Sequence, residues 1–397
     1  MSILDVVSDD DFDNVPDRTL SVTTTDDDVA GFTIAETSGS TGVDESGSTD
    51  LFTVVLNAQP TTDVVLTISS GDTGEATVTS SLTFTSANWD TAQDVTVTGV
   101  DDDIVDGSVT STITVAINDG SSDDNFDAVA DQTVSVTTTD DDVAGFTIAE
   151  TEGSTGVTEA GSTDLFSVVL DKAPLSDVVF AISSSDTGEA TVTSSLTFTA
   201  ANWDTPQNVT VTGADDNIID GSVTSNISVS INDGSSDNAF DAVADQTVSV
   251  TTTDDDVAGF TIAETNGSTG VTEAGSTDLF TVVLNAQPNS DVVFAISSSD
   301  TGEATVTSSL TFTSANWDTA QNVTVTGVDD DIIDGSQVST STISIIGAIS
   351  DDNFDAVADQ TVSVTTTDDD VAGFTIAETS GSTGVDESGS TDIFTVV

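Results

Sequence analysis

The chain has 397 residues, a formal net charge of −69, only two basic residues, and no cysteine, histidine or tyrosine. This charge excludes nucleic acid and anionic membranes as partners, because both bind basic surfaces, and it indicates cations instead. The missing cysteines exclude disulfides as a source of stability, and no apolar run reaches the roughly 18 residues that a membrane-spanning helix needs.

A long internal repeat organises the chain. The segment DDDVAGFTIAET begins at four positions, Asp26, Asp140, Asp254 and Asp368. Successive starts are 114 residues apart (140 − 26, 254 − 140 and 368 − 254). We interpret the chain as the end of a preceding repeat, three full repeats, and the start of a following one, at 1–28, 29–142, 143–256, 257–370 and 371–397. A unit of this size fits one β-sandwich domain and is too long for one solenoid coil.

Within the first unit, short runs with apolar residues at alternate positions predict seven β-strands. In chain order they are 32–34, 51–56, 64–68, 82–84, 95–97, 112–115 and 134–136. Gly, Asp, Asn and Ser separate them, and no stretch has the periodicity of an amphipathic helix. The sequence therefore predicts an all-β fold, with tandem antiparallel β-sandwich domains in an extended rod. It leaves the order of strand pairing open.

Single large aromatic residues recur at equivalent positions of the three units. They are Trp89, Trp203 and Trp317, and Phe126, Phe240 and Phe354. We expect them to be packing anchors of each core, because a large ring buries much apolar surface.

Carboxylates gather at three places in each unit. One run of aspartates follows the strand predicted at 95–97, a second run closes the unit, and a single glutamate lies in the loop after the first strand. In the first unit they are Glu45, Asp101, Asp102, Asp106, Asp140, Asp141 and Asp142. In the second they are Glu159, Asp215, Asp216, Asp220, Asp254, Asp255 and Asp256. In the third they are Glu273, Asp329, Asp330, Asp334, Asp368, Asp369 and Asp370.

An acidic run is most often a solvated loop, but the loops of a sandwich gather at two poles. If the strands before the two aspartate runs point the same way, both runs and the glutamate lie at one pole. Two carboxylates about 5 Å apart repel by roughly 3 kcal/mol at an effective dielectric of about 20. Calcium accepts about six to eight oxygen ligands in flexible geometry, whereas zinc prefers His and Cys. We therefore interpret the clusters as calcium sites at the junctions between units.

Two further groups are secondary candidates. The loop Asp123–Asp127 is a second candidate calcium site, and the glutamates of the motif Gly-Glu-Ala-Thr-Val are candidates for extra ligands at the junctions. These glutamates are Glu75, Glu189 and Glu303.

The order of motifs resembles the Calx-β repeat. It comprises Val-Ala-Gly-Phe-Thr-Ile, a Val-x-Glu loop, Leu-Thr-Phe, Val-Thr-Val-Thr-Gly-Val-Asp-Asp-Asp and the closing Asp-Asp-Asp. That family comprises calcium-binding sandwiches of sodium/calcium exchangers and of large bacterial surface proteins and adhesins. The resemblance implies Ig-like, Calx-β-like sandwiches whose calcium ligands are the junction carboxylates named above. A further aspartate of the family has no clear counterpart here, so the number of ions per junction stays open.

These observations predict calcium-stiffened structural spacer repeats of an extracellular adhesin or cell-surface fibre. The expected partners are calcium ions and neighbouring repeats of the same chain. The alternative is a self-assembling extracellular filament or surface-layer subunit, in which copies of the chain associate. A third hypothesis is adaptation to high salt by acidic surface residues.

We do not expect an enzyme, because without His, Cys or Tyr acid–base work would fall to carboxylates alone. The N-terminal Met-Ser-Ile-Leu-Asp-Val lacks the pattern of a signal peptide, so we expect any export signal to lie outside this sequence.

Overall fold

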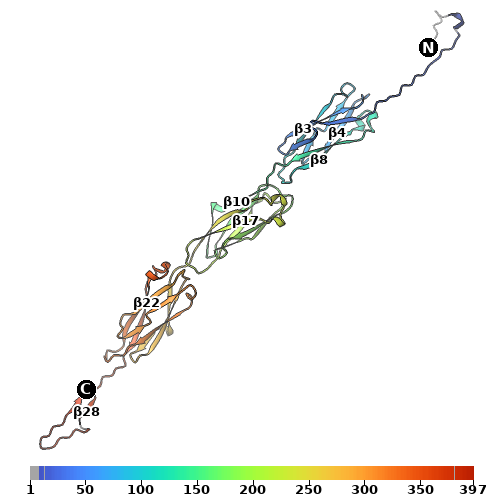
Figure 1. Cartoon of the computed structure of the whole chain (residues 1–397). Helices are drawn as coiled ribbons and strands as arrows, with labels where there is room; N and C mark the ends of the chain where they lie inside the picture. Colours follow the sequence, from blue (N-terminus) through green and yellow to red (C-terminus); the bar gives the residue numbers. More distant parts are fainter. Residues whose placement is uncertain (1–8, 13, 380) are drawn as a thin grey trace.

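The alternating apolar residues form strands that pack into a row of β-sandwiches (Figure 1). The computed structural model describes residues 9–12, 14–379 and 381–397. In these ranges every helical segment is a 3-10 turn of three residues, and none is long and apolar enough to cross a membrane. The prediction of an all-β chain in an extended rod is confirmed.

The first sandwich contains nine strands, two more than the sequence predicted. They are β1 (Phe32–Glu36), β2 (Thr41–Asp44), β3 (Thr49–Leu56), β4 (Val64–Ser70), β5 (Ala76–Val78), β6 (Ser81–Phe84), β7 (Gln93–Gly99), β8 (Val109–Ile117) and β9 (Gln132–Thr139). The sequence analysis missed β2 and β5, because each is short and has too few apolar residues to show alternation.

The second and third sandwiches repeat this order. The second contains β10 (Phe146–Glu150), β11 (Thr155–Thr158), β12 (Thr163–Leu170), β13 (Val178–Ser184), β14 (Ala190–Val192), β15 (Ser195–Phe198), β16 (Gln207–Gly213), β17 (Val223–Ile231) and β18 (Gln246–Thr253). The third contains β19 (Phe260–Glu264), β20 (Thr269–Thr272), β21 (Thr277–Leu284), β22 (Val292–Ser298), β23 (Ala304–Val306), β24 (Ser309–Phe312), β25 (Gln321–Gly327), β26 (Gln337–Ile345) and β27 (Gln360–Thr367). After them, β28 (Ile376–Glu378) and β29 (Phe394–Val396) form an antiparallel hairpin.

Two sheets make up each sandwich. In the first, one sheet has the order β1-β3-β7-β5 and the other β2-β9-β8-β4-β6. All neighbouring strands are antiparallel except β2 and β9, which run parallel with Asp44 opposite Thr139. The second and third sandwiches contain the same parallel pair. The sheets are thus antiparallel as predicted, except for this one parallel pair, which the sequence did not predict. The parallel pairing brings the ends of β2 and β9 to the same pole.

Alternate residues of each strand fill the space between the sheets. In β3, for example, Phe52, Val54 and Leu56 are buried. The predicted phenylalanine anchors Phe126, Phe240 and Phe354 are buried, and the tryptophans Trp89, Trp203 and Trp317 pack against the three cores. The prediction that these aromatic residues anchor the cores is thus confirmed.

In the first and second sandwiches, the loop after the seventh strand (the docking loop, residues 100–108 and 214–222) contacts the next sandwich. Ile104 forms a parallel bridge with Ala173, and Val105 donates its N–H to the oxygen of Ala173 (3.0 Å). Val105 is only 9% exposed and belongs to the core of the second sandwich. Ile218 and Gln287 form the same bridge at the next junction. These contacts cross the unit boundaries that the repeat predicts, and they neither confirm nor contradict those boundaries, which stay a prediction.

Candidate metal centre

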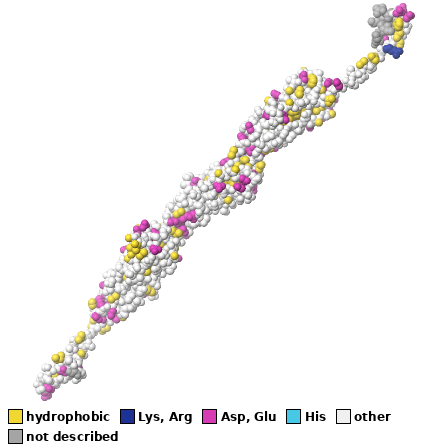
Figure 2. Space-filling view, viewed as in Figure 1, with side chains coloured by type: hydrophobic (Ala, Val, Ile, Leu, Met, Phe, Trp, Pro, Cys, Tyr) yellow, Lys and Arg dark blue, Asp and Glu magenta, His cyan; other side chains and the backbone are white. Residues whose placement is uncertain are grey.

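The pole of the first sandwich that faces the second carries an acidic cluster. Since β2 and β9 end there side by side, Glu45 directly after β2 lies beside Asp140 directly after β9. Glu75 precedes β5, and its main-chain oxygen accepts a hydrogen bond from the N–H of Val100 (2.9 Å), where the docking loop begins. Several segments that are distant in sequence therefore meet at this pole. Figure 2 shows acidic side chains gathered near the constrictions between sandwiches.

The carboxylates of this cluster form two groups, and within each group the oxygens lie within 4.8 Å of one another. Glu45, Asp140 and Asp142 form one, and Glu45, Glu75 and Asp106 form the other. The shared Glu45 is 1% exposed. The other sandwiches have comparable groups, namely Glu159, Asp216 and Asp256; Glu159, Glu189 and Asp220; and Glu273, Asp330 and Asp370. Two groups that share one glutamate can hold two neighbouring cations.

Several of these buried oxygens accept no hydrogen bond from the described residues. In the first cluster they are Glu45 Oε2, Glu75 Oε2, Asp106 Oδ1 and Asp142 Oδ2. The other clusters repeat this at Glu159, Glu189, Asp256, Glu273, Glu303 and Asp370. A buried polar atom without a partner costs about 1–3 kcal/mol, and more when it is charged. A divalent cation in each oxygen group would satisfy these atoms, so the residues fit such ions.

Burial and the charges of neighbouring aspartates raise the pKa of the buried glutamates in these clusters. Burial first, and then the charges of Asp140 and Asp102, raise the pKa of Glu45 to about 7. Burial first, and then the charges of Asp254 and Asp216, raise the pKa of Glu159 to about 7. Burial also raises the pKa of Glu75, with help from the neighbouring aspartates. At neutral pH the cluster therefore resists full ionisation, and a bound cation would reverse this preference.

Main-chain N–H groups of the docking loop orient two aspartates of the cluster. Asp140 Oδ2 accepts hydrogen bonds from the N–H of Gly107 (2.7 Å) and of Asp106 (3.1 Å). Asp102 Oδ1 accepts one from the N–H of Ile104 (2.7 Å). Gly107 has a φ of +73°, which residues with a side chain rarely adopt, and this explains the Asp-Gly pair. The cluster and the docking contact thus belong to one hydrogen-bonded loop.

The predicted ligands separate into inner and outer residues. The inner residues belong to the oxygen groups or act by charge on the central glutamate. They are Glu45, Asp102, Asp106, Asp140 and Asp142; Glu159, Asp216, Asp220, Asp254 and Asp256; and Glu273, Asp330, Asp334, Asp368 and Asp370. The outer residues are exposed, and they are Asp101, Asp141, Asp215, Asp255, Asp329 and Asp369. Water can satisfy these outer carboxylates, so they need no cation.

Glu75, Glu189 and Glu303 lie closer to the centre than the sequence indicated. The sequence analysis treated them only as candidates for extra ligands, but Glu75 and Glu189 belong to the oxygen groups. Each of the three has a buried carboxylate oxygen without a hydrogen bond. The sequence did carry a signal for these ligands, because one glutamate stands among uncharged residues in the motif Gly-Glu-Ala-Thr-Val of every full unit.

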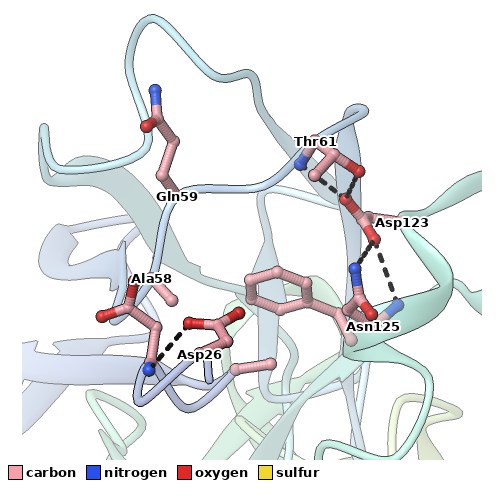
Figure 3. Close-up of a pocket in the computed structure, with 9 residues that line it drawn as sticks. Asp26, Ala58, Gln59, Thr61, Asp123 and Asn125 are labelled. Carbon is pink, nitrogen blue, oxygen red and sulfur yellow. Dashed lines mark hydrogen bonds between the residues drawn. The ribbon is translucent and has the colours of Figure 1, made fainter. Parts of the chain in front are cut away.

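The second candidate site, the loop Asp123–Asp127, is built differently (Figure 3). Asp123 Oδ2 accepts hydrogen bonds from the N–H and hydroxyl of Thr61 (2.6 and 2.7 Å) and from the N–H of Thr62 (3.0 Å). Its Oδ1 accepts from the N–H and side-chain amide of Asn125 (3.1 and 2.9 Å). These bonds, led by the Thr61 hydroxyl, hold the pKa of Asp123 well below its usual range. Since both oxygens hold the loop together, the structure does not support a calcium site at Asp123.

Comparisons with known proteins find similarity at low identity only. No protein-family model and no curated protein matches the chain. Among solved structures, it is similar to the calcium binding domain CBD12 of CALX1.1, with 15% identity, 50% of this chain and 80% of that chain covered, and a TM-score of 0.22. The values for an I-band fragment of titin are 9%, 86%, 97% and 0.25. Those for domains 4–9 of the surface layer protein SbsC are 15%, 83%, 44% and 0.23.

Proposed function

We propose that the chain consists of structural spacer repeats of an extracellular adhesin or cell-surface fibre, stiffened by Ca²⁺ bound at the acidic clusters. The observation that carries the proposal is the set of buried carboxylate oxygens without hydrogen-bond donors, gathered where one sandwich meets the next. In this proposal the chain has no catalytic role, and its function lies in length and stiffness.

The chemistry of the donors favours calcium. All candidate ligands are carboxylates, and the chain has no His or Cys for zinc or copper. Magnesium demands near-ideal octahedral geometry and retains several waters, whereas calcium accepts a larger and less regular set of oxygens. Carboxylates from several independent segments meet this second requirement better than the first.

The position of the cluster explains how a bound ion would stiffen the rod. Asp102 and Asp106 flank Ile104 and Val105, which dock on the second sandwich. An ion held by these aspartates orders the loop that makes the contact. The linker adds little freedom, because only residues 140–145 separate β9 from β10. Bound ions would thus help to fix the angle between neighbouring sandwiches.

Thermal unfolding tests this proposal. Millimolar CaCl₂ should raise the melting temperature by about 10 °C or more over a sample in EDTA, because an ion that binds only the folded state adds its binding free energy to stability. Equimolar MgCl₂ and sodium chloride of matched ionic strength are the controls. An unchanged melting temperature would contradict the proposal. Equal stabilisation by molar KCl in EDTA would favour adaptation to high salt instead.

A second candidate function is a self-assembling extracellular filament or surface-layer subunit. Sedimentation velocity in CaCl₂ distinguishes the two. Concentration-dependent growth of the sedimentation coefficient would support assembly, and a constant monomer would support the spacer.

A further inference from the structure

The two internal junctions share a main-chain bridge but differ in charge. At the first junction, Asp103 of one sandwich faces Lys172 of the next. At the second, the equivalent positions 114 residues later hold Asn217 and Ala286. The main-chain bridge is present at both. The junctions therefore differ in their side chains. A charged pair spans the first, whereas at the second the side chains of Asn289 and Asn353 donate hydrogen bonds to the main-chain oxygen of Ile219 (2.8 and 2.9 Å).

Lys172 reaches from the second sandwich into the cluster of the first. Its Nζ lies 2.7 Å from Asp103 Oδ1 and 2.6 Å from Asp142 Oδ1. The Asp142 side chain is only 5% exposed, and its other oxygen, Oδ2, accepts no hydrogen bond from the described residues. Asp142 also belongs to one of the two oxygen groups around Glu45. The ammonium group and a cation in that group would thus share one carboxylate.

The equivalent aspartate at the second junction has no such partner within the chain. Asp256 takes the place of Asp142 in the second cluster, beside Glu159 and Asp216. The only basic residues of the chain are Lys172 at the first junction and Arg18 in the N-terminal segment. No basic side chain therefore competes with an external cation for the acidic group at Asp256.

We propose that the Lys172 ammonium acts as a built-in cation at the first junction, which therefore binds calcium more weakly than the second junction and stays docked without it. This inference rests on the proposed function, since it assumes that the clusters bind Ca²⁺. An ion on Asp142 Oδ2 would lie about 6 Å from the ammonium. Even in the dielectric of bulk water, about 80, which gives the smallest effect, their repulsion weakens binding about tenfold.

The consequence is a rod whose junctions respond differently to calcium. When calcium is removed, the Asp103–Lys172–Asp142 bridge still joins the first two sandwiches, because its cation is covalently part of the chain. The second junction loses its counter-ions and keeps the like charges of its clustered aspartates, with no basic side chain beside them. Loss of calcium should therefore loosen the rod at the second junction before the first.

Calcium titration by isothermal calorimetry on the full chain tests the affinity difference. Lys172→Met removes the ammonium but keeps an unbranched apolar stem, and it should strengthen the weakest binding step about tenfold. The double substitution Asn217→Asp with Ala286→Lys builds the charged pair at the second junction. It should weaken one of the tighter steps about tenfold. Lys172→Arg, which keeps the charge, is the matched control and should change little.

Electron spin resonance distances test the mechanical difference, since the chain has no native cysteine to interfere with labelling. Spin labels at Thr137→Cys and Thr251→Cys span the first junction, and labels at Thr251→Cys and Thr365→Cys span the second. All three positions are exposed. In EDTA the distance distribution across the first junction should be at most half as wide as that across the second. Lys172→Met should broaden the first to match.

The outcomes separate this inference from the proposed function. If calcium binds no cluster, both are overturned. If calcium binds with unchanged affinities in Lys172→Met, or if both junctions show equal widths in EDTA, only the role of Lys172 is overturned.

Discussion

A Cβ atom at Gly99 would lie 1.9 Å from the main-chain oxygen of Asp44. Gly99 ends β7 in one sheet and Asp44 ends β2 in the other, so the two sheets meet backbone to backbone at the pole of the cluster. A Cβ atom at Gly213 would likewise lie 2.0 Å from the main-chain oxygen of Thr158. Since Glu45 and the docking loop begin just beyond this contact, the glycine sets the distance between them.

Gly99→Ala should therefore destabilise the first sandwich by about 2–4 kcal/mol, because a backbone atom cannot move aside for the added methyl group. Urea unfolding followed by Trp89 fluorescence measures this, in a background where Trp203→Phe and Trp317→Phe silence the other sandwiches. Gly120→Ala is the matched control, since its nearest neighbour is 4.0 Å away and its φ is not positive. Equal stability of the two variants would contradict the close-contact argument.

Glu45→Gln should have opposite effects with and without calcium. In metal-free buffer at pH 8 it removes a buried charge among aspartates, and the first sandwich should gain roughly 1–3 kcal/mol after allowance for solvent screening. In calcium the variant should lose most of the stabilisation by the ion, because the shared ligand is gone. Melting curves in both buffers measure this. Asp101→Asn, at an exposed outer residue, is the control and should keep the calcium response.

The pH dependence of the metal-free chain follows from the raised pKa of Glu45 and Glu159. Each rises from 4.5 to about 7 on folding, so the folded state holds its protons more tightly than the unfolded state. The resulting stability is fully present below pH 4.5 and is lost as the pH rises through 7. Without metal, melting temperatures should therefore fall between pH 5 and pH 8. With saturating calcium this fall should disappear, and a fall of equal size in both buffers would argue against the cluster as its source.

Asp123→Ala should destabilise the first sandwich without changing calcium binding. The variant loses five hydrogen bonds to Thr61, Thr62 and Asn125, so its melting transition should fall by about 5 °C or more. Calcium stoichiometry by calorimetry should equal that of the wild type. The stability of Asp123→Asn, which keeps one acceptor oxygen, should lie between that of the wild type and that of Asp123→Ala. If either variant bound fewer calcium ions than the wild type, the loop would be a metal site after all.

Much of the candidate site could be predicted from sequence because its residues lie in strongly marked loops. The repeated aspartate runs stood out against a Thr- and Ser-rich background, and the near absence of basic residues implied an external cation. The sequence could not rank the aspartates within each run. Burial alone separates Asp102 from Asp101 and Asp142 from Asp141, and burial depends on the turn of the loop against neighbouring strands.

The sequence by itself determined the all-β class, the repeat and the place of the acidic loops. These follow from alternation along each strand and from composition, which are local properties. Only the tertiary structure decided that β2 runs parallel to β9, that Glu75 joins Glu45, and that Lys172 crosses the junction to Asp142. These contacts join segments far apart in the chain, and their geometry depends on how the two sheets pack and how one sandwich docks on the next.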